Sequence, residues 1–383
     1  MDNVMAKLYG DTRSEVQRTY DKSSIEVLRK SEILSETRAE ESAGVPDSLL
    51  YLVNFDDDKG FAVLSASRKL SEDIYCVTEA GSLSVEDLSA AAARMSGDTQ
   101  TRSEYADTSE TFVSMGVSFV HELLVGAVIM ESVYGRKPAI DSVESRADID
   151  RTKYGPFLKT KWGQKDDKKI FNRYTPNNAP AGCVAIATAQ IMEYWKHPSN
   201  PVFWERLCDW DGMETVYNHV TLGKNEDTTY CDHVACFVRS IGKHDSCRID
   251  YGNGPDSGSS GNAEGAQRAL QKYGYRDVDK HLGFGSKNQG IADKCIRGGR
   301  PVFLAGIGNG KGHAWVLDGM WGTAYHINWG WKGVYDGYFR KGLFDVTARS
   351  SYDMMDPGTV NEKETFKATR NYRLVTYGSG FKN

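Results

Sequence analysis

Residues 301–331 read PVFLAGIGNGKGHAWVLDGMWGTAYHINWGW, and this stretch decides what kind of sheet the chain can form. Three short apolar runs, at 301–307, 313–318 and 324–329, are separated by glycine-containing connections. Runs of this length that are rich in Val, Ile, Phe, Trp and Tyr are typical of β-strands, and glycine is common in the turns between them. We therefore expect three consecutive strands that form an antiparallel meander.

The register of the second hairpin brings two polar residues together. If residues 319–322 form the turn, Asp318 pairs with Thr323 and His313 lies directly opposite Asn328. Directly opposed side chains share one face of the sheet. An imidazole that acts as a base needs a third group to hold its tautomer, commonly an asparagine side chain, and this register would supply one.

The stretch CVAIATAQIMEYWK at 183–196 has its apolar residues at spacings of three and four, as in a helix packed into a core. Cys183 would lie in the first turn of that helix. Unpaired backbone N–H groups and the helix dipole favour a thiolate there, so we expect a lowered thiol pKa. Most cysteines are buried and inert, and the other six in the chain are interpreted in that way.

Cys183 requires a base if it is a nucleophile, and His313 follows it by 130 residues. Papain-like enzymes separate the two by about 130 to 150 residues. Upstream, the side-chain amide of Gln164 could stabilise an oxyanion beside the Cys183 backbone N–H. Trp329 could shield the imidazole from water, although a tryptophan in a strand is more often part of the core.

Composition and charge exclude several classes of protein. The 383 residues carry 47 Lys and Arg against 52 Asp and Glu, with no run of five basic residues, so we expect no nucleic-acid partner. The longest strongly apolar stretch, 123–130, is far shorter than the roughly 20 residues that span a bilayer. Residues 1–15 contain no apolar signal core, so the protein is either intracellular or has lost a secretion signal.

The length predicts two domains, or one domain with a large extension. Residues 49–55 and 61–65 are expected to form a hairpin, followed by a helix capped at Ser84 and a second helix over 112–134. The charged stretch that follows, 136–153, is expected to be an exposed linker.

Two further patterns are interpreted without a ligand. The spacing within one set of Cys and His residues matches no usual zinc module, so we expect no metal site there. That set is Cys231, His233, Cys236, His244 and Cys247. The glycine-rich loop 306–312 lacks the ending of a phosphate-binding loop and is interpreted as a flap beside His313. No cofactor is expected.

Three motifs carry a resemblance to a known family. They are AGCVAIATAQIM at 181–192, GHAWVLDG at 312–319 and HINWGW at 326–331. Together they resemble the streptopain family of bacterial cysteine peptidases. The similarity extends from residue 161 to about 345, including GPDSGSSG at 254–261, and more loosely to YLVNF at 51–55 and GFAVLS at 60–65.

The resemblance implies an α+β architecture and a zymogen. It implies an α+β inhibitory prodomain over 1–135 and a linker over 136–153. A papain-like catalytic domain, with a helical part and an antiparallel sheet, would then occupy 154–383. It also implies a protein found outside the cell, at the cell surface or in the periplasm, whose signal peptide is absent from this sequence. Activation cleavage would fall in the linker, with candidate positions Arg136, Lys137, Arg146, Arg151 and Lys153.

The resemblance also implies roles for single residues. Cys183 would be the nucleophile and His313 the base, with Gln164 in the oxyanion hole and Asn328 and Trp329 supporting the histidine. Ser257, Ser259 and Gly312 would line the substrate cleft. Both serines lie in the loop 254–261, which we call the serine loop, and a solvated turn is an equal alternative for it. The partners implied are protein or peptide substrates and the chain's own prodomain.

Two other functions remain open at this point. The same Cys-His pair would serve an amidase or transpeptidase that acts on cell-wall peptides. A catalytically silent adhesion or inhibitor protein could also use this fold, although every polar member of the proposed site is present.

Overall fold

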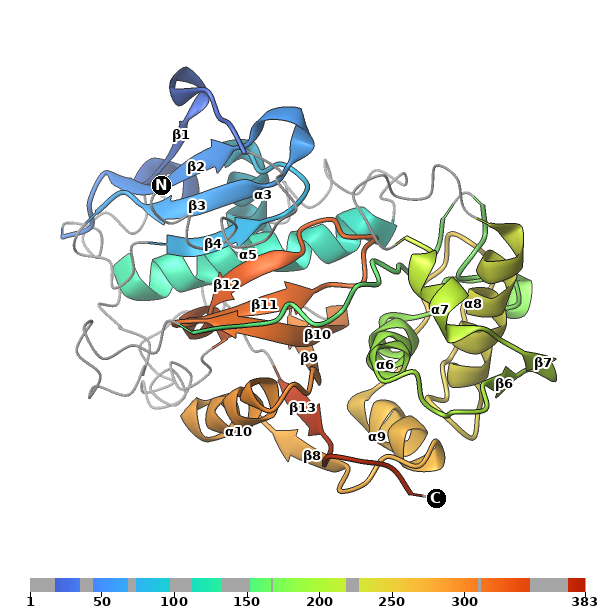
Figure 1. Cartoon of the computed structure of the whole chain (residues 1–383). Coiled ribbons are helices and arrows are strands. Elements are labelled where there is room, and N and C mark those ends of the chain that lie inside the picture. Colours follow the sequence, from blue (N-terminus) through green and yellow to red (C-terminus); the bar gives the residue numbers. More distant parts are fainter. Residues whose placement is uncertain are drawn as a thin grey trace, which may run out of the picture.

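The structure is a computed structural model, and it describes residues 18–34, 44–67, 74–96, 112–132, 152–166, 168–217, 227–308, 311–344 and 371–382. We call the described residues up to 132 the N-terminal region and those from 152 onward the C-terminal region. Figure 1 shows strands of both regions in one long sheet, with helices packed around it.

The described strands of this sheet number eleven. Their order is β1-β2-β3-β4-β12-β11-β10-β9-β13-β8, with β5 paired to β10, and all pairs are antiparallel. The strands are β1 (Glu26–Arg29), β2 (Ser48–Asn54), β3 (Phe61–Ser65), β4 (Ile74–Thr78), β5 (Lys153–Tyr154), β8 (Asp279–Leu282), β9 (Val302–Gly308), β10 (Lys311–Trp321), β11 (Ala324–Asn328), β12 (Gly337–Arg340) and β13 (Arg373–Thr376). A separate ribbon pairs β6 (Val202–Phe203) with β7 (Arg206–Leu207).

The helices form two groups (Figure 1). They are α2 (Lys30–Ile33), α3 (Val85–Ser96), α5 (Phe112–Ser132), α6 (Cys183–Tyr194), α7 (Trp210–Thr215), α8 (Thr228–Ile241), α9 (Ala263–Lys272) and α10 (Ser286–Arg297). Helix α5 runs along the sheet beside β4 and β12, whereas α6 to α9 form a helical lobe beside β9 and β10. The expected combination of a helical part with an antiparallel sheet is confirmed.

The local predictions for the N-terminal region are confirmed. Strands β2 and β3 form the expected hairpin, with Asn54 paired to Phe61. Helix α3 begins directly after Ser84, whose Oγ accepts a hydrogen bond from the Asp87 backbone N–H at 3.1 Å. The Asp87 carboxylate accepts in return from the Ser84 backbone N–H at 3.0 Å, which completes a reciprocal cap.

The two regions share the sheet through β4 and β12. Thr78 pairs with Gly337 and Cys76 pairs with Phe339. This contact joins residues about 260 positions apart, and no local pattern in the sequence indicates it. The N-terminal strands therefore extend the sheet of the C-terminal region directly.

The meander of β9, β10 and β11 is confirmed, but its predicted register is wrong. The β10–β11 hairpin closes at the pair Trp321–Ala324, with Gly322 taking the positive φ of 54° in the tight turn. A register shift between Leu317 and Gly319 displaces the rest of the ladder. As a result, Asn328 lies opposite Val316 and not opposite His313.

Most of the expected linker, 136–153, lies outside the described residues, and so do four of the five candidate cleavage positions. Lys153 is described, and it pairs with Trp321 as part of β5. This backbone is held in the sheet, which disfavours cleavage directly after Lys153.

All seven cysteines are described, and none of them forms a disulfide. Six of them are buried, and Cys183 is half-buried. Within the described ranges, no group of three or more His, Cys, Asp or Glu side chains is placed to hold a metal ion. None of the helices described here has both the length and the apolar character needed to cross a membrane.

Candidate active site

Helix α6 fixes the position of Cys183. The helix begins there because Gly182 takes a positive φ of 88° that turns the backbone, and an added Cβ at Gly182 would lie 3.2 Å from Ile249 Cγ2. Every α6 residue over 184–193 is buried. The helix is therefore held firmly within its lobe, and Cys183 is presented at its first turn.

The Cys183 thiol faces β10. Backbone N–H groups of Ala314, Val184 and Cys183 itself favour its thiolate form, but burial outweighs them and raises the pKa of the Cys183 thiol. The predicted lowering of this pKa by the helix terminus is thus wrong for this state of the protein. Because Ala314 follows His313 directly, the same contact places the thiol at the backbone next to the predicted base.

His313 is held by a backbone carbonyl. Its Nε2 donates a hydrogen bond to the Trp329 carbonyl oxygen at 2.9 Å. A carbonyl can only accept, so the neutral ring carries its proton on Nε2 and keeps Nδ1 as the free acceptor. Burial lowers the pKa of His313 to about 4, partly opposed by the Trp329 carbonyl, and the ring is therefore neutral at pH 7.

Aromatic rings surround the His313 imidazole. Trp331 stacks on it at a centroid distance of 4.6 Å, and Trp329 lies at 6.1 Å. Phe119, on α5 of the N-terminal region, lies at 6.3 Å from His313. Trp329 was expected to cover the imidazole. Trp331 was missed, although it stands in the same HINWGW motif, and no sequence signal indicates Phe119.

Asn328 does not orient His313 by a direct bond. Its Oδ1 accepts from the Gly330 backbone N–H at 3.0 Å and from Gln190 Nε2 at 2.9 Å. Its Nδ2 donates to the Thr160 carbonyl at 2.8 Å. Among the described residues, the hydrogen-bond partner of the imidazole is the Trp329 carbonyl. This carbonyl belongs to the same peptide unit as the Gly330 N–H that Asn328 holds.

Comparison with known proteins identifies the part of the chain that contains this site. Residues 162–339 match the model of the Peptidase C10 family. We call this matched part of the chain the C10 region. The C10 region contains all the catalytic candidates, which are Cys183, His313, Gln164, Asn328 and Trp329.

The curated relatives of the C10 region include one that is named a thiol protease. Streptopain from Streptococcus pyogenes serotype M1 is 32% identical over 204 residues, which cover 46% of this chain and 49% of the relative. The thiol protease/hemagglutinin PrtT of Porphyromonas gingivalis is 26% identical over 234 residues, 55% of this chain and 26% of the relative. The match to streptopain therefore spans only about half the length of that relative.

A solved structure shares the fold over nearly the whole chain. It is a fragment of prointerpain A from Prevotella intermedia, with a TM-score of 0.58 at 20% sequence identity. The match covers 93% of this chain and 100% of the fragment. The likeness thus includes the N-terminal region as well as the C10 region.

Gln164 lies in the C10 region close to the start of α6. Its carbonyl accepts a hydrogen bond from the Ala181 backbone N–H at 2.8 Å, two residues before Cys183. Its side chain is buried, and within the described chain Oε1 has no hydrogen-bond partner. The structure thus anchors the Gln164 segment beside the segment that carries the nucleophile candidate.

The serine loop of the C10 region packs beside the same helix terminus. An added Cβ at Gly261 would lie 3.2 Å from Val184 Cβ. Lys165 donates from Nζ to the Pro255 carbonyl at 2.9 Å, which ties the loop to the residue after Gln164. Ser257 Oγ donates to the Gly254 carbonyl at 2.6 Å and so stabilises the loop itself.

The remaining two substrate-binding candidates differ in exposure. Ser259 Oγ is buried and lacks a hydrogen-bond partner within the described ranges. Gly312 is exposed and directly precedes His313 on β10. An exposed backbone beside the histidine is suited to contact an extended peptide.

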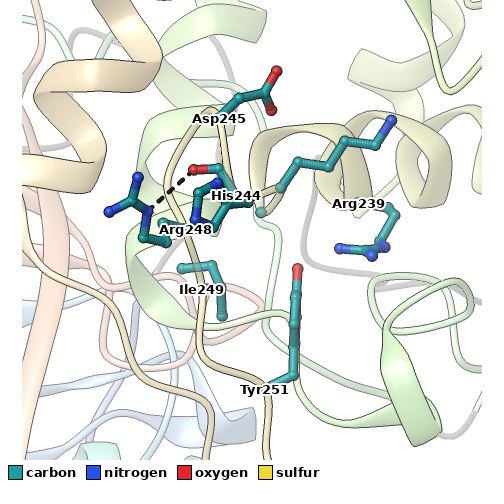
Figure 2. Close-up of a pocket in the computed structure, with 8 residues that line it drawn as sticks. Arg239, His244, Asp245, Arg248, Ile249 and Tyr251 are labelled. Carbon is teal, nitrogen blue, oxygen red and sulfur yellow. Dashed lines mark hydrogen bonds between the residues drawn. The ribbon is translucent and has the colours of Figure 1, made fainter.

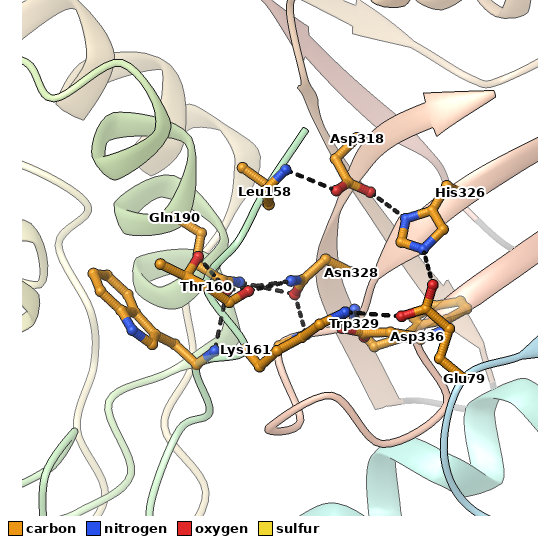
Figure 3. A network of polar contacts seen from close by, with 12 residues as sticks. Glu79, Leu158, Thr160, Lys161, Gln190, Asp318, His326, Asn328, Trp329 and Asp336 are labelled. Atoms are coloured by element: carbon orange, nitrogen blue, oxygen red, sulfur yellow. Dashed lines mark hydrogen bonds and ion pairs between the residues drawn. The ribbon is translucent and has the colours of Figure 1, made fainter. Parts of the chain in front are cut away.

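A buried network of charges adjoins residues 329–331 (Figure 3). We call these residues the histidine loop, because their Trp329 carbonyl binds His313. Glu79 of the N-terminal region contacts Lys161 Nζ and His326 Nε2, both at 3.1 Å. His326 Nδ1 also contacts Asp318 at 2.6 Å, and Lys161 contacts Asp336 at 3.2 Å. The two carboxylates raise the pKa of His326 to about 9 despite its burial, so the ring is charged at pH 7.

A cavity of about 460 Å³ lies elsewhere in the C10 region and has a basic lining (Figure 2). Its lining includes Arg239, Lys243, His244, Arg248 and Tyr251. Figure 2 shows Arg239 and Arg248 on opposite sides of it. The lining contains no cysteine. The catalytic candidates therefore remain those around Cys183.

Proposed function

We propose that the chain is a latent cysteine endopeptidase that hydrolyses protein or peptide substrates with Cys183 and His313. The observation that supports the proposal is the position of Cys183 at the start of α6, against the backbone of β10 next to His313. The Cys183 thiol reaches the N–H of Ala314, directly after His313, and the proton of the His313 ring is fixed on Nε2. Nδ1 is thereby left as the basic nitrogen.

The reaction follows from these roles. His313 Nδ1 takes the proton of Cys183 Sγ as the sulfur attacks the substrate carbonyl carbon. The imidazolium then protonates the leaving amine, and a thioester remains on Cys183. The same imidazole takes a proton from a water molecule, whose oxygen attacks the thioester and releases the carboxylate product and the thiol.

Other residues support this chemistry. The Cys183 backbone N–H and the Gln164 side-chain amide would donate to the oxyanion that forms during each attack. Asn328 would support His313 indirectly, because its Oδ1 holds the N–H of the peptide unit whose carbonyl binds Nε2. Trp329 stacks beside the ring and limits access of water. Ser257, Ser259 and Gly312 would contact the substrate.

The N-terminal region would act as the inhibitory prodomain. We propose domain limits of 1–135 for the prodomain, 136–153 for the linker and 154–383 for the catalytic domain. Latency is supported by Phe119, which lies against His313, and by the neutral state of both the thiol and the imidazole. A location outside the cell is part of the same proposal, and fractionation of the native host would test it.

The proposal predicts self-activation that depends on the thiol. Under reducing conditions the wild-type chain should shorten to a fragment that begins near residues 136 to 154, while hydrolysis of casein rises from a low initial rate. The Cys183→Ala variant should keep its mass and its fold, and it should show no hydrolysis. Mass spectrometry and a casein assay on the same samples measure both effects.

Two results would contradict the proposal. Hydrolysis by Cys183→Ala would exclude Cys183 as the nucleophile. A wild-type chain that stays at 42.6 kDa and remains inactive, even after trypsin cleavage of the linker, would favour a silent protein. Release of peptides from peptidoglycan without hydrolysis of casein would favour the cell-wall amidase.

A further inference from the structure

The residue that holds the catalytic histidine is itself held by a buried carboxylate. The Trp329 carbonyl accepts from His313 Nε2 at 2.9 Å. The Trp329 N–H donates to Asp336 Oδ1 at 2.8 Å. Trp329 therefore links Asp336 to His313 through the backbone of a single residue, and any movement of that backbone would move the carbonyl that fixes the imidazole.

Asp336 is placed rigidly. It is 0% exposed, and its Oδ2 contacts Lys161 Nζ at 3.2 Å. A buried carboxylate is costly unless it is paired and hydrogen-bonded, and Asp336 has both kinds of partner. Its backbone is also fixed, since its carbonyl accepts from the Glu79 N–H at 2.7 Å and its N–H donates to the Gly333 carbonyl at 3.2 Å.

A second carboxylate in the same network provides a comparison (Figure 3). Asp318 is 1% exposed, so it is as deeply buried as Asp336. Its oxygens contact His326 Nδ1 at 2.6 Å and the Leu158 N–H at 3.1 Å. It makes no hydrogen bond to Trp329 within the described chain. The two residues therefore separate the general effect of a buried charge from a specific effect on the histidine loop.

We propose that Asp336 is a positioning residue for His313, acting through the Trp329 backbone. Its carboxylate holds the Trp329 N–H, so that the Trp329 carbonyl keeps the ring proton on Nε2 and leaves Nδ1 as the basic nitrogen. Lys161 stabilises the charge that makes Asp336 a strong acceptor. The proposal rests on the proposed function, because a positioned imidazole affects catalysis only if His313 is the base.

The first test examines the ring of His313 in the full chain and does not depend on hydrolysis. Histidine labelled with ¹⁵N reports the tautomer of each ring by NMR, and a His313→Gln variant assigns the signal. We expect a single Nε2–H tautomer of His313 in the wild type and in Asp318→Asn, and mixed tautomers in Asp336→Ala. Asp336→Asn retains an oxygen acceptor and should retain the tautomer.

The second test compares kinetics after identical cleavage of the linker. Loss of one buried hydrogen bond predicts a kcat about 10- to 100-fold lower for Asp336→Ala, with KM within about 3-fold and a displaced acidic limb in the pH profile of kcat/KM. Asp336→Asn, with a neutral acceptor, should lose about 3- to 10-fold in kcat. Asp318→Asn should keep the pH profile of the wild type.

The outcomes separate the two proposals. An unchanged His313 tautomer in Asp336→Ala, or an equal change in Asp318→Asn, would overturn the positioning role whatever the activity of the wild type. If Asp336→Ala does not fold, Asp336→Asn decides the question through kcat, and an unchanged kcat would overturn the role. A changed tautomer in Asp336→Ala beside a wild type that never hydrolyses casein would support the positioning role and contradict the proposed function.

Discussion

At the scale of single residues, the state of the site depends on how His313 is enclosed. Trp331, Trp329 and Trp315 lie within 6.1 Å of the ring, and Phe119 closes the enclosure from the N-terminal region. Such burial disfavours the imidazolium and so lowers the pKa of His313. A neutral imidazole and a protonated thiol are both in their unreactive forms. Removal of the covering Phe119 ring should make the Cys183 thiol more reactive.

The covering role of Phe119 can be tested by truncation. Phe119→Ala should raise the pKa of His313 from about 4 towards the ordinary 6.5, because water reaches the ring. In the full chain, iodoacetamide should then modify Cys183 faster than in the wild type. Peptide mass mapping can follow Cys183 because the other six cysteines are buried. The truncation should also lower the free energy of unfolding by about 3 to 5 kcal/mol.

A matched variant separates covering from packing. Val128 is fully buried on the same helix, nine residues further along and so about 13 Å away along its axis. Val128→Ala should destabilise the protein without changing the alkylation of Cys183. Equal acceleration by both variants would show that loosening of α5, and not the Phe119 ring, exposes the site.

At the scale of elements, α6 connects the proposed nucleophile with the loop that holds the histidine. Cys183 begins the helix, and Gln190 follows two turns later with its side chain fully buried. Gln190 Nε2 donates to Asn328 Oδ1, while its Oε1 accepts from the Trp162 N–H at 3.1 Å and from Thr160 Oγ1 at 3.0 Å. One helix therefore sets the position of both halves of the proposed site.

Replacement of Gln190 should weaken this connection. Gln190→Met keeps the length of the side chain but removes its donor and its acceptor, which leaves buried polar groups of Asn328, Thr160 and Trp162 without that partner. We expect a loss of about 2 to 4 kcal/mol in the free energy of unfolding and a lower kcat in the activated enzyme. Urea denaturation and casein kinetics measure the two effects.

Thr188 provides the control on the same helix. Its Oγ1 donates to the Val184 carbonyl at 2.7 Å, inside α6, and its side chain is equally buried. Thr188→Val should therefore change stability alone. A normal kcat in Gln190→Met, at any stability, would show that the helix and the histidine loop keep their relative position without this amide.

The elements could be predicted from the sequence wherever the signal is local. The hairpin of β2 and β3, the cap at Ser84 and the start of α6 each follow from spacing and residue type within about a dozen positions. The register of β10 and β11 could not be predicted, because the shift lies at Asp318, whose buried side chain contacts Leu158, 160 residues away, as well as His326. The pair of candidates Cys183 and His313 was predictable, whereas the support of the histidine by a backbone carbonyl carries no side-chain signature.

At the scale of the whole molecule, the two regions are joined by sheet and by charge. Strand β4 pairs with β12, and the buried carboxylate of Glu131 on α5 pairs with Arg340 on β12. Glu79 adds a third connection, since it joins Lys161 and His326 of the C-terminal region. A region held in these three ways should remain bound after a single cut in the linker, so its release should depend on conditions that weaken the contacts.

The Glu79 contacts predict how the union of the two regions depends on pH. The pKa of His326 is raised from 6.5 to about 9, chiefly by Asp318 and Glu79 against its burial, so its stabilisation is full below pH 6.5 and is lost as the pH rises through about 9. The pKa of Glu79 is lowered from 4.5 by Lys161 and His326, so its stabilisation is present above pH 4.5 and is lost in acid. Thermal unfolding should therefore show the highest stability between about pH 5 and pH 6.5, with a decline from pH 6.5 to about 9. In Glu79→Gln the loss of stability at high pH should be smaller and complete below pH 9, because His326 keeps only one carboxylate partner and its folded pKa falls. The control is Glu264→Gln, which removes an exposed ion pair with Lys280 inside the C-terminal region and should leave the pH profile unchanged. Coincident profiles for the wild type and Glu79→Gln would show that β4, β12 and the Glu131–Arg340 pair hold the two regions together without this network.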